Sequence, residues 1–379
     1  MPRIVADENI PLAREAFGAF GDVELVAGRK IDARTVADAD ALIVRSVTRV
    51  GDALLDGSRV RFVGTATIGT DHVDLAALER RGVAFASAPG CNARSVAEYL
   101  AAVLLELEHE LGRDFRGATI GVVGVGNVGR RVSEVARVLG LRVLQCDPPR
   151  AEREPGFASV SLDVLVRAAD VLTFHVPLEK DGPHATRHLL NAERIEQLRP
   201  DAIVVNSSRG GVVDDDALAI ACAAGRAEAV LDVWEDEPHP SAAMLGMVRI
   251  ATPHIAGYSL DGKLAGTRMI ADALARTLGV PGPDAGVFDA PVAEPAIRGS
   301  ESGRAAIREA VRRVYDVRAD DARLRAALAE AGAAEARGAA FDRLRRDYPV
   351  RREFAGFRVR GVAGDEERRT LAELGFGVL

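Results

Sequence analysis

The chain has 379 residues, more than one ordinary domain holds, so two or three domains are expected. Hydrophobic residues make up 48% of the chain and charged residues 28%, which excludes a globally disordered protein. The formal net charge of −7 argues against nucleic acid or an anionic membrane surface as the main partner. Cys91, Cys146 and Cys222 lie far apart and show neither a disulfide framework nor zinc-site spacing. No signal peptide or membrane span is recognised, so a cytoplasmic location is expected.

The first ninety residues alternate short apolar runs with helical stretches. Apolar runs bounded by polar or glycine-bearing segments are typical of strands in a buried parallel sheet. Helices are predicted between the strands at Leu12–Phe20 and Val73–Arg80. The strands are predicted at Arg3–Ala6, Val23–Ala27, Ala41–Arg45, Arg61–Thr65 and Val83–Ala86.

A long amphipathic helix is predicted to begin at Ser95, because Ser95 and Glu98 have the spacing of a capping box. Apolar residues then follow at three- and four-residue steps as far as Leu111, which places them on one helical face. After Gly117 a second alternation of strands and helices begins, and it predicts a second doubly wound parallel sheet. Its strands are predicted at Thr119–Val123, Arg142–Cys146, Val171–His175, Ala202–Asn206 and Ala229–Val233.

The C-terminal part differs in pattern from the two alternating regions. Residues 279–295 carry several Pro, Gly and Asp residues and are predicted to be a linker. A helix at Arg304–Tyr315, a strand at Arg351–Arg360 and a short helix at Glu366–Leu374 are predicted beyond it. The apolar side of the first of these helices needs a partner surface, and we expect a second copy of the chain to supply it. That side consists of Ile307, Val311, Val314 and Tyr315.

A glycine-rich segment matches the pattern G-x-G-x-x-G, in the order Gly124, Val125, Gly126, Asn127, Val128 and Gly129. The pattern alone is a weak signal, but here it directly follows a predicted strand and precedes a predicted helix, which is the context of a dinucleotide site. Gly126 lets the backbone approach a pyrophosphate at the helix N-terminus. Asp147, at the end of the next strand, is placed to accept hydrogen bonds from ribose hydroxyls. That carboxylate favours NAD over NADP.

Three later strands each end in polar residues. Arg209 follows the apolar run Ala202–Val205, Glu237 follows Ala229–Leu231 and His254 follows Val248–Ala251. The carboxyl ends of parallel strands meet at one edge of a sheet, so these polar residues can converge there. A histidine suits the removal of a proton near neutral pH, and a carboxylate beside it fixes its tautomer. An arginine binds a substrate carboxylate and polarises a developing carbonyl. This set predicts hydride transfer from a small 2-hydroxy acid.

These segments resemble the D-isomer-specific 2-hydroxyacid dehydrogenase family over about residues 1–285. Further segments, in both the first 285 residues and the tail, are similar to one branch of that family, which acts on a phosphorylated four-carbon 2-hydroxy acid. They are Val63–Asp74, Ala88–Asn92, Cys146–Arg150, His254–Tyr258, Val314–Arg318, Asp320–Leu324 and Phe341–Arg345.

The resemblance implies an α/β fold with two doubly wound parallel-sheet domains and a small α+β C-terminal domain. A flavodoxin-like substrate domain would span residues 1–94, completed by 258–283, and a Rossmann NAD-binding domain would span 95–257. Residues 284–379 would form a dimerisation domain, so a homodimer is expected. His254 would be the acid/base, Glu237 its partner and Arg209 the carboxylate ligand. The remaining contacts that the resemblance implies are Ser46, Thr67 and Tyr258 for substrate, and Asp147, Asp232, Gly257 and the backbone at Val176 and Ser208 for NAD. Arg45 is added as a substrate contact from its place after a strand, and Gly124, Gly126, Asn127, Val128 and Gly129 as NAD contacts from the glycine-rich pattern.

Several alternatives stay open on the sequence. Arg45 and Arg49 form a candidate clamp for the substrate's second anionic group, and Arg94 is a rival ligand for it. No metal site is expected; His72, between two acidic residues, is interpreted as structural. Other functions to weigh are a related dehydrogenase, such as one acting on 3-phosphoglycerate, and a non-catalytic NADH-sensing regulator.

Overall fold

The computed structural model describes residues 1–289, 296–299 and 302–379 and divides into two compact units. Unit 1 comprises Met1–Asn92 and Ser259–Pro291, and unit 2 comprises Ala93–Tyr258 and Val292–Leu379. Part of the predicted linker, residues 290–295, lies outside the described residues. Within the described ranges, no helix is long and apolar enough to cross a membrane.

Unit 1 is built on a five-stranded parallel sheet with the strand order β2-β1-β3-β4-β5, which is the flavodoxin-like order. Apolar clusters cover both faces, which explains why the strands read as continuous apolar runs. All five predicted strands are present, each within a residue or two of its predicted bounds. They are β1 (Arg3–Asp7), β2 (Asp22–Val26), β3 (Ala41–Val44), β4 (Phe62–Thr65) and β5 (Ala84–Ala86).

The helices of unit 1 are short except for α12, which belongs to the second segment of this unit, Ser259–Pro291. Ser259 caps the N-terminus of α12. The apolar side of α12 packs on the sheet face to which Phe62 of β4 contributes its side chain. A side chain at Gly64 would meet Ile270 Cγ2 at 2.4 Å, so glycine is what allows this close approach. The helices are α1 (Ala13–Phe17), α2 (Ala33–Val36), α3 (Asp52–Leu55), α4 (Leu75–Arg80) and α12 (Leu260–Leu278).

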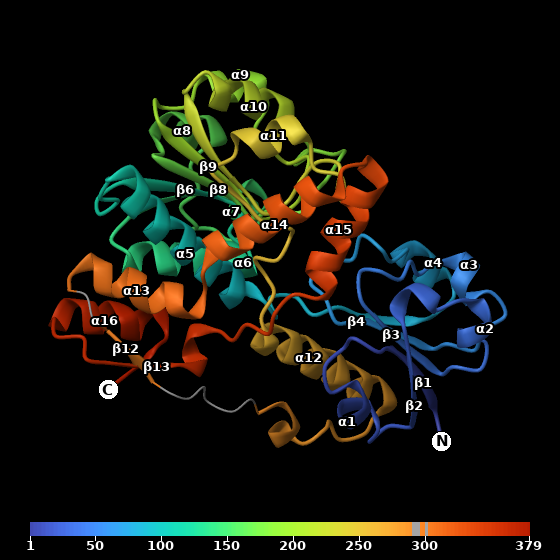
Figure 1. Ribbon diagram of the computed structural model, residues 1–379. Coiled ribbons are helices and arrows are strands. Elements are labelled where there is room, and N and C mark those ends of the chain that lie inside the picture. Colours follow the sequence, from blue (N-terminus) through green and yellow to red (C-terminus); the bar gives the residue numbers. More distant parts are fainter. Residues whose placement is uncertain (290–295, 300–301) are drawn as a thin grey trace. The chain divides into compact units, whose positions relative to one another are not determined.

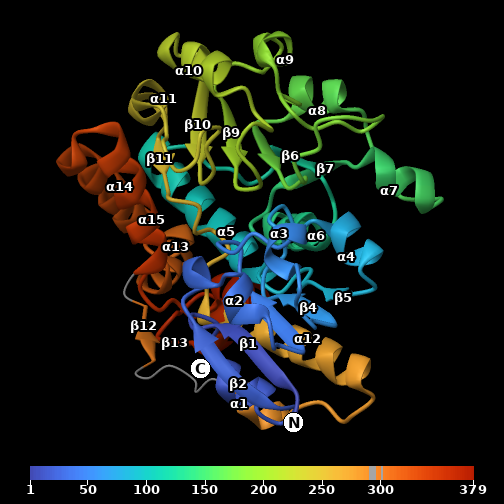
Figure 2. The same cartoon turned by 90° about the vertical axis from the view of Figure 1, so that its right-hand side faces the viewer.

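Unit 2 contains a six-stranded parallel sheet with the order β11-β10-β9-β8-β6-β7 (Figures 1 and 2). The neighbours of β6 are β7 on one side and β8 on the other, so the strand order reverses at β6. The fifth predicted strand of this region, Ala229–Val233, is placed two residues too late, because Val233 is buried in a loop rather than in the ladder. The strands are β6 (Thr119–Val123), β7 (Arg142–Cys146), β8 (Val171–Phe174), β9 (Ala202–Asn206), β10 (Ala227–Leu231) and β11 (Ile250–Ala251).

Helices cover both faces of this sheet, and the longest of them corrects one prediction. Helix α5 begins at Ala93, so Ser95 and Glu98 lie inside it and the capping box is wrong. Both side chains are buried and bind distant segments: Ser95 Oγ donates to the Ala256 carbonyl at 3.0 Å, and Glu98 Oε1 accepts from the Phe354 N–H at 2.9 Å. The helices are α5 (Ala93–Leu111), α6 (Asn127–Val138), α7 (Pro148–Arg153), α8 (Leu162–Ala168), α9 (Ala192–Glu196), α10 (Asp215–Ala223) and α11 (Ala242–Met247).

The C-terminal part of unit 2 is mostly helical, with a small three-stranded parallel sheet in the order β12-β13-β14. The helices predicted at 304–315 and 366–374 are present, whereas the strand predicted at Arg351–Arg360 is wrong over most of its length: only Arg358–Arg360 pairs, and Phe354 lies in a 3₁₀ turn. Two long helices, α14 and α15, escaped prediction. The elements are α13 (Arg304–Val314), α14 (Val317–Ala331), α15 (Ala334–Arg346), α16 (Asp365–Leu374), β12 (Ile297–Arg298), β13 (Arg358–Arg360) and β14 (Gly377–Val378).

The C-terminal elements share the hydrophobic core of the 93–258 segment. Ile307, Val311 and Tyr315 are at most 4% exposed and belong to the same cluster as the apolar face of α5, which α13 accompanies in Figure 1. Leu324, Leu328 and Phe341 cover the opposite face of the sheet. The argument that the apolar side of α13 needs a second copy of the chain is therefore wrong, because the same chain already covers it.

Candidate active site

The glycine-rich loop joins β6 to α6 at the point where the strand order reverses. Gly124 has φ of 82°, and a side chain there would meet the His175 carbonyl at 2.7 Å. A side chain at Gly129 would come within 1.9 Å of the Gly124 carbonyl, so glycine permits the close packing of helix and strand. Gly126, the N-cap of α6, is the opposite case: nothing lies within 4 Å of a side chain placed there. The loop thus leaves open space beside a helix N-terminus, which fits the pyrophosphate of a dinucleotide.

Asp147 lies where the sequence placed it, directly after β7. Its two carboxylate oxygens accept hydrogen bonds from the Val125 N–H at 2.7 Å and the Arg150 N–H at 2.9 Å. Asp147 therefore ties the glycine-rich loop to the start of α7 and still has lone pairs for ribose hydroxyls. The Arg150 guanidinium donates to Glu154 at 2.7 Å and lies over the ring of Phe157.

Glu237 and His254 form a hydrogen-bonded pair, with 2.8 Å between Glu237 Oε2 and His254 Nδ1. The other carboxylate oxygen accepts from the Trp234 N–H at 3.0 Å, which fixes the side chain. Burial acts to raise the pKa of Glu237, but the charge and hydrogen bond of His254, with the charge of Arg345, outweigh it and lower the pKa. The carboxylate is therefore ionised near neutral pH, which leaves His254 Nδ1 as the donor and Nε2 as the available base.

The His254 segment is held by a buried carboxylate. Asp232 is 1% exposed and accepts hydrogen bonds from the Thr252 hydroxyl and from the N–H groups of Ile255 and Ala256 at 2.6–2.9 Å. His254 itself has φ of 57°, a conformation that costs free energy in a non-glycine residue, and the Asp232 contacts on either side hold it there. Burial raises the pKa of Asp232, while the charge of His254 and these donors lower it. Asp232, which the sequence assigned to NAD, thus has an evident role in supporting His254.

The loop that carries Arg209 packs against the loop that carries Glu237. A side chain at Gly210 would lie 1.8 Å from the Trp234 carbonyl, so glycine is required for the contact. Asn206 organises the loop: its amide donates to the Arg209 carbonyl at 2.9 Å and accepts from the Ser208 N–H at 3.1 Å. Arg209 Nη1 donates to the Ser208 carbonyl at 2.8 Å. Unit 2 therefore brings the three predicted segments together at one edge of its sheet.

The other predicted NAD contacts surround this edge. Asn127 and Val128 begin α6, and a methyl group of Val176 lies 2.7 Å from the position of a side chain on Gly124. Ser208 is buried beside Asn206, and Gly257 lies in the turn after His254. Ser208 thus lies in the Arg209 loop, and the other residues lie next to the glycine-rich loop or the His254 segment.

The predicted substrate residues divide between the two units. Ser46 is exposed in unit 1, after Arg45, whose Nε donates to the buried Asp7 carboxylate at 3.1 Å. The hydroxyl of Thr67 is hydrogen-bonded to the hydroxyl of Thr65, with 2.8 Å between the two oxygens. Tyr258 belongs to unit 2, where its ring packs edge-on against Tyr348 with 5.8 Å between ring centroids.

Arg94 is not part of unit 1, which carries Arg45 and Arg49. It belongs to unit 2, and its Nη1 lies only 2.5 Å from the position of a side chain on Gly375, so it points toward the C-terminal segment. His72 Nε2 is hydrogen-bonded to Thr65 Oγ1 at 3.0 Å, consistent with a structural role.

Sequence reasoning missed two cations. The pKa of Lys263 in α12 is lowered, mainly by burial and further by the positive charge of Arg45. Lys263 therefore lies near Arg45 in unit 1. Arg345 of α15 acts electrostatically on Glu237. No sequence motif includes Lys263, so nothing marked it as a candidate. Arg345 lies in the segment that the sequence assigned only to a dimerisation domain.

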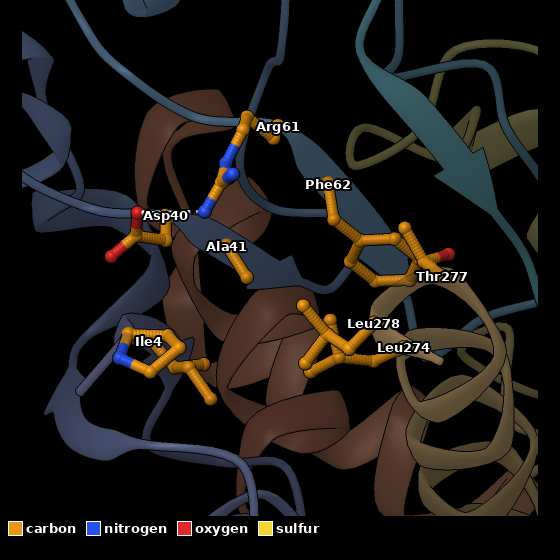
Figure 3. A pocket seen from close by; sticks show the side chains of 9 residues that line it. Ile4, Asp40, Ala41, Arg61, Phe62, Leu274, Thr277 and Leu278 are labelled. Atoms are coloured by element: carbon orange, nitrogen blue, oxygen red, sulfur yellow. Dashed lines mark hydrogen bonds and ion pairs between the residues drawn. The ribbon is translucent and has the colours of Figure 1, made fainter. Parts of the chain in front are cut away.

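A cavity in unit 1 lies away from the residues discussed so far. It is lined by the starts of β1, β3 and β4 and by the end of α12, and Figure 3 shows Phe62, Leu274 and Leu278 around it with Arg61 above. These are the amino ends of the strands, opposite to the ends where ligands bind in such sheets. The cavity is therefore not a candidate substrate site.

Comparisons with known proteins agree with this geometry. Residues 92–256 match the family model described as D-isomer specific 2-hydroxyacid dehydrogenase, NAD binding domain, and residues 290–375 match a domain of unknown function. The crystal structure of a D-lactate dehydrogenase from Aquifex aeolicus, complexed with NAD and lactic acid, has a TM-score of 0.59 and 25% identity, covering 73% of this chain and 96% of the other. The expected α/β fold and the NAD cofactor are thereby confirmed.

Two curated relatives match nearly the whole chain. The erythronate-4-phosphate dehydrogenase of Azotobacter vinelandii is 52% identical, covering 97% of this chain and 96% of the relative. That of Klebsiella pneumoniae is 45% identical, covering 100% and 98%. The resemblance seen in the sequence is confirmed, and the chain belongs to the erythronate-4-phosphate dehydrogenases, a branch of the D-isomer-specific 2-hydroxyacid dehydrogenase family.

Proposed function

We propose that the chain oxidises 4-phospho-D-erythronate to (R)-3-hydroxy-2-oxo-4-phosphooxybutanoate with NAD, a step of pyridoxal 5′-phosphate biosynthesis. The observation that carries the proposal is the hydrogen-bonded pair of Glu237 and His254 beside a glycine-rich loop that fits a dinucleotide. The names of the full-length relatives supply the substrate.

His254 is the acid/base of the proposed reaction. Its Nδ1–H donates to Glu237, so the lone pair on Nε2 accepts the proton of the substrate's C2 hydroxyl. The ionised Glu237 favours the resulting imidazolium, which makes proton removal easier. NAD, when bound, supplies the acceptor for the hydride that leaves C2. Removing one hydride and one proton from the alcohol leaves the 2-oxo acid.

Arg209 binds the substrate carboxylate and polarises the C2 oxygen as the carbonyl forms. Ser46, Thr67, Tyr258 and Arg45 are the proposed further substrate contacts. Gly124, Gly126, Asn127, Val128 and Gly129 hold the pyrophosphate, and Asp147 accepts from the adenosine ribose. Val176, Ser208, Asp232 and Gly257 complete the proposed NAD-binding set.

The proposed assembly is a cytoplasmic homodimer. Residues 284–379 stay the proposed dimerisation domain, although the apolar side of α13 is not the surface involved. Light scattering of the full chain tests the dimer: a mass of one chain at micromolar concentration contradicts it.

An absorbance assay of NADH formation tests the function. The wild-type chain should turn over erythronate 4-phosphate faster than erythronate, 3-phosphoglycerate or D-lactate. Preference for 3-phosphoglycerate would assign it to a different dehydrogenase. NADH binding without turnover of any 2-hydroxy acid would point to a regulator.

A further inference from the structure

Helix α15 runs beside the two segments that carry Glu237 and His254. At its start, the Ala334 carbonyl accepts from His239 Nδ1, with 3.2 Å between them. A side chain at Gly338 would meet His239 Cε1 at 2.4 Å, so the helix lies directly on the loop that follows Glu237. The start of α15 is thus fixed two residues from the proposed partner of the base.

The end of α15 reaches the segment after His254. Tyr348, just beyond the helix, packs edge-on against Tyr258, and its hydroxyl donates to Asp320 of α14 at 2.8 Å. Arg345, in the last turn, is hydrogen-bonded to the Tyr258 side chain. The C-terminal segment therefore holds Tyr258, a proposed substrate contact, through two side chains, Tyr348 and Arg345.

The charge of Arg345 also acts on Glu237, whose pKa it lowers. Desolvation lowers the pKa of Arg345, but Tyr258 and Glu237 raise it above its usual value, so the guanidinium stays charged. Its Nε is buried and has no hydrogen-bond partner among the described residues. His254 also lowers the pKa values of the two carboxyl groups near it, Asp232 and Glu237.

We propose that Arg345 is a positioning residue of the hydride-transfer site, which holds the Tyr258 side chain in place and presents its positive charge to Glu237. The C-terminal segment, which matches a domain of unknown function, then supplies part of the site as well as part of the core. This inference rests on the proposed function for the roles of Glu237, His254 and Tyr258.

The test compares R345M and R345K with R346M. Arg346 lies in the same helical turn but is exposed and paired with Asp347 at 2.8 Å, so R346M is a matched control. R345M should lower kcat/KM about 10- to 100-fold while the Kd for NADH changes less than about twofold. Removing a positive charge makes protonation of both Glu237 and His254 easier. Because the oxidation needs neutral His254, the acid limb of kcat/KM should move up by about 1 pH unit.

R345K keeps the charge and should return the acid limb to the wild-type position. KM should stay raised, because the lysine ammonium cannot reproduce the hydrogen bond of the guanidinium to Tyr258. An NMR titration of His254 in the protein without substrate gives an independent readout, with its signal assigned by its loss in H254A. Its midpoint should rise in R345M and not in R346M. The NMR result separates this inference from the proposed function, which fails only if wild-type protein shows no turnover of erythronate 4-phosphate. The inference is overturned if R345M behaves as R346M does, or if R345M and R345K lose activity and thermal stability equally with no shift of midpoint.

Discussion

At the scale of single residues, the Glu237–His254 pair makes the sharpest prediction. H254A should leave the Kd for NAD nearly unchanged and lower kcat by about 10²–10⁴-fold, the usual size of an acid/base contribution. Ligand titration and turnover at saturation measure the two quantities separately. Weak NAD binding with normal turnover at saturation would mean that His254 belongs to the cofactor site and not to proton transfer.

Asp147 should set the preference for NAD over NADP. D147A should narrow the preference by weakening NAD, because the ribose hydroxyls lose their acceptor. The substitution also removes the cap of α7 and the bond to Val125, so D147S serves as the control that keeps a helix cap. Both variants should show a narrower preference for NAD when kcat/KM is measured with each cofactor. Equal use of NADP by the wild type would show that the interpretation of Asp147 is wrong.

The sequence predicted the residues that chemistry requires but not those that support them. Glu237 and His254 were found because each follows a strand and suits proton transfer. The buried role of Asp232 and the left-handed backbone of His254 depend on contacts between loops far apart in sequence, which no local pattern encodes.

At the scale of elements, strands were predicted better than helix starts or the C-terminal segment. Strands buried on both faces leave short, continuous apolar runs that are easy to recognise. Ser95 and Glu98, in contrast, have the spacing of a helix cap but are buried partners of Ala256 and Phe354. The tail strand prediction failed for a similar reason. Apolar and charged residues alternate at the start of this stretch, but the charged Arg351 is only 6% exposed and pairs with Glu98, with 3.7 Å between the charged atoms. The alternation therefore reflects contacts with α5 and not a strand in a sheet.

The shared core predicts the result of removing the C-terminal segment. A chain ending at residue 289 loses Ile307, Val311, Phe354, Leu371 and Leu374 from the core of unit 2. Burying each such side chain contributes about 1.5–3 kcal/mol. Their combined loss is comparable to the whole stability of a domain, about 5–15 kcal/mol. The truncated chain should therefore unfold at a much lower temperature, lose NADH binding and aggregate.

Thermal unfolding, NADH titration and light scattering check this outcome together. A truncated chain that is monomeric, binds NADH as the full chain does and keeps its melting temperature would contradict it. In that case the segment would be an independent dimerisation domain.

At the scale of the whole molecule, the two units divide the proposed substrate contacts between them. Unit 2 carries Arg209 and the Glu237–His254 pair, and unit 1 carries Arg45, Arg49 and Lys263. The sequence predicted that a phosphate ligand would come from the first hundred residues, and it found two of these cations by their position after a strand. Lys263 lies in the second segment of unit 1, Ser259–Pro291, far from the two arginines in the sequence, so only the fold groups it with them.

The substrate should need two anionic ends, a carboxylate for Arg209 and a phosphate for the unit 1 cations. Erythronate lacks the phosphate and loses one or more charge-assisted bonds of about 1.5–3 kcal/mol each, so its kcat/KM should be lower by a factor on the order of 10² or more. Binding energy from a remote group of this kind should appear in kcat as well as in KM. Steady-state rates with the two substrates on one preparation give the ratio directly.

Variants then identify the ligands of the phosphate. R45A leaves the buried Asp7 without its ion pair and is expected to be less stable, but the ratio of kcat/KM for the two substrates does not depend on the active fraction. The ratio should shrink in R45A and in R49A if these arginines bind the phosphate, and it should stay unchanged in R94A, because Arg94 points toward the C-terminal segment. If the wild type turns over erythronate and its 4-phosphate equally well, no phosphate clamp exists. The proposal of a phosphorylated substrate then falls, while the dehydrogenase chemistry of Arg209, Glu237 and His254 still stands.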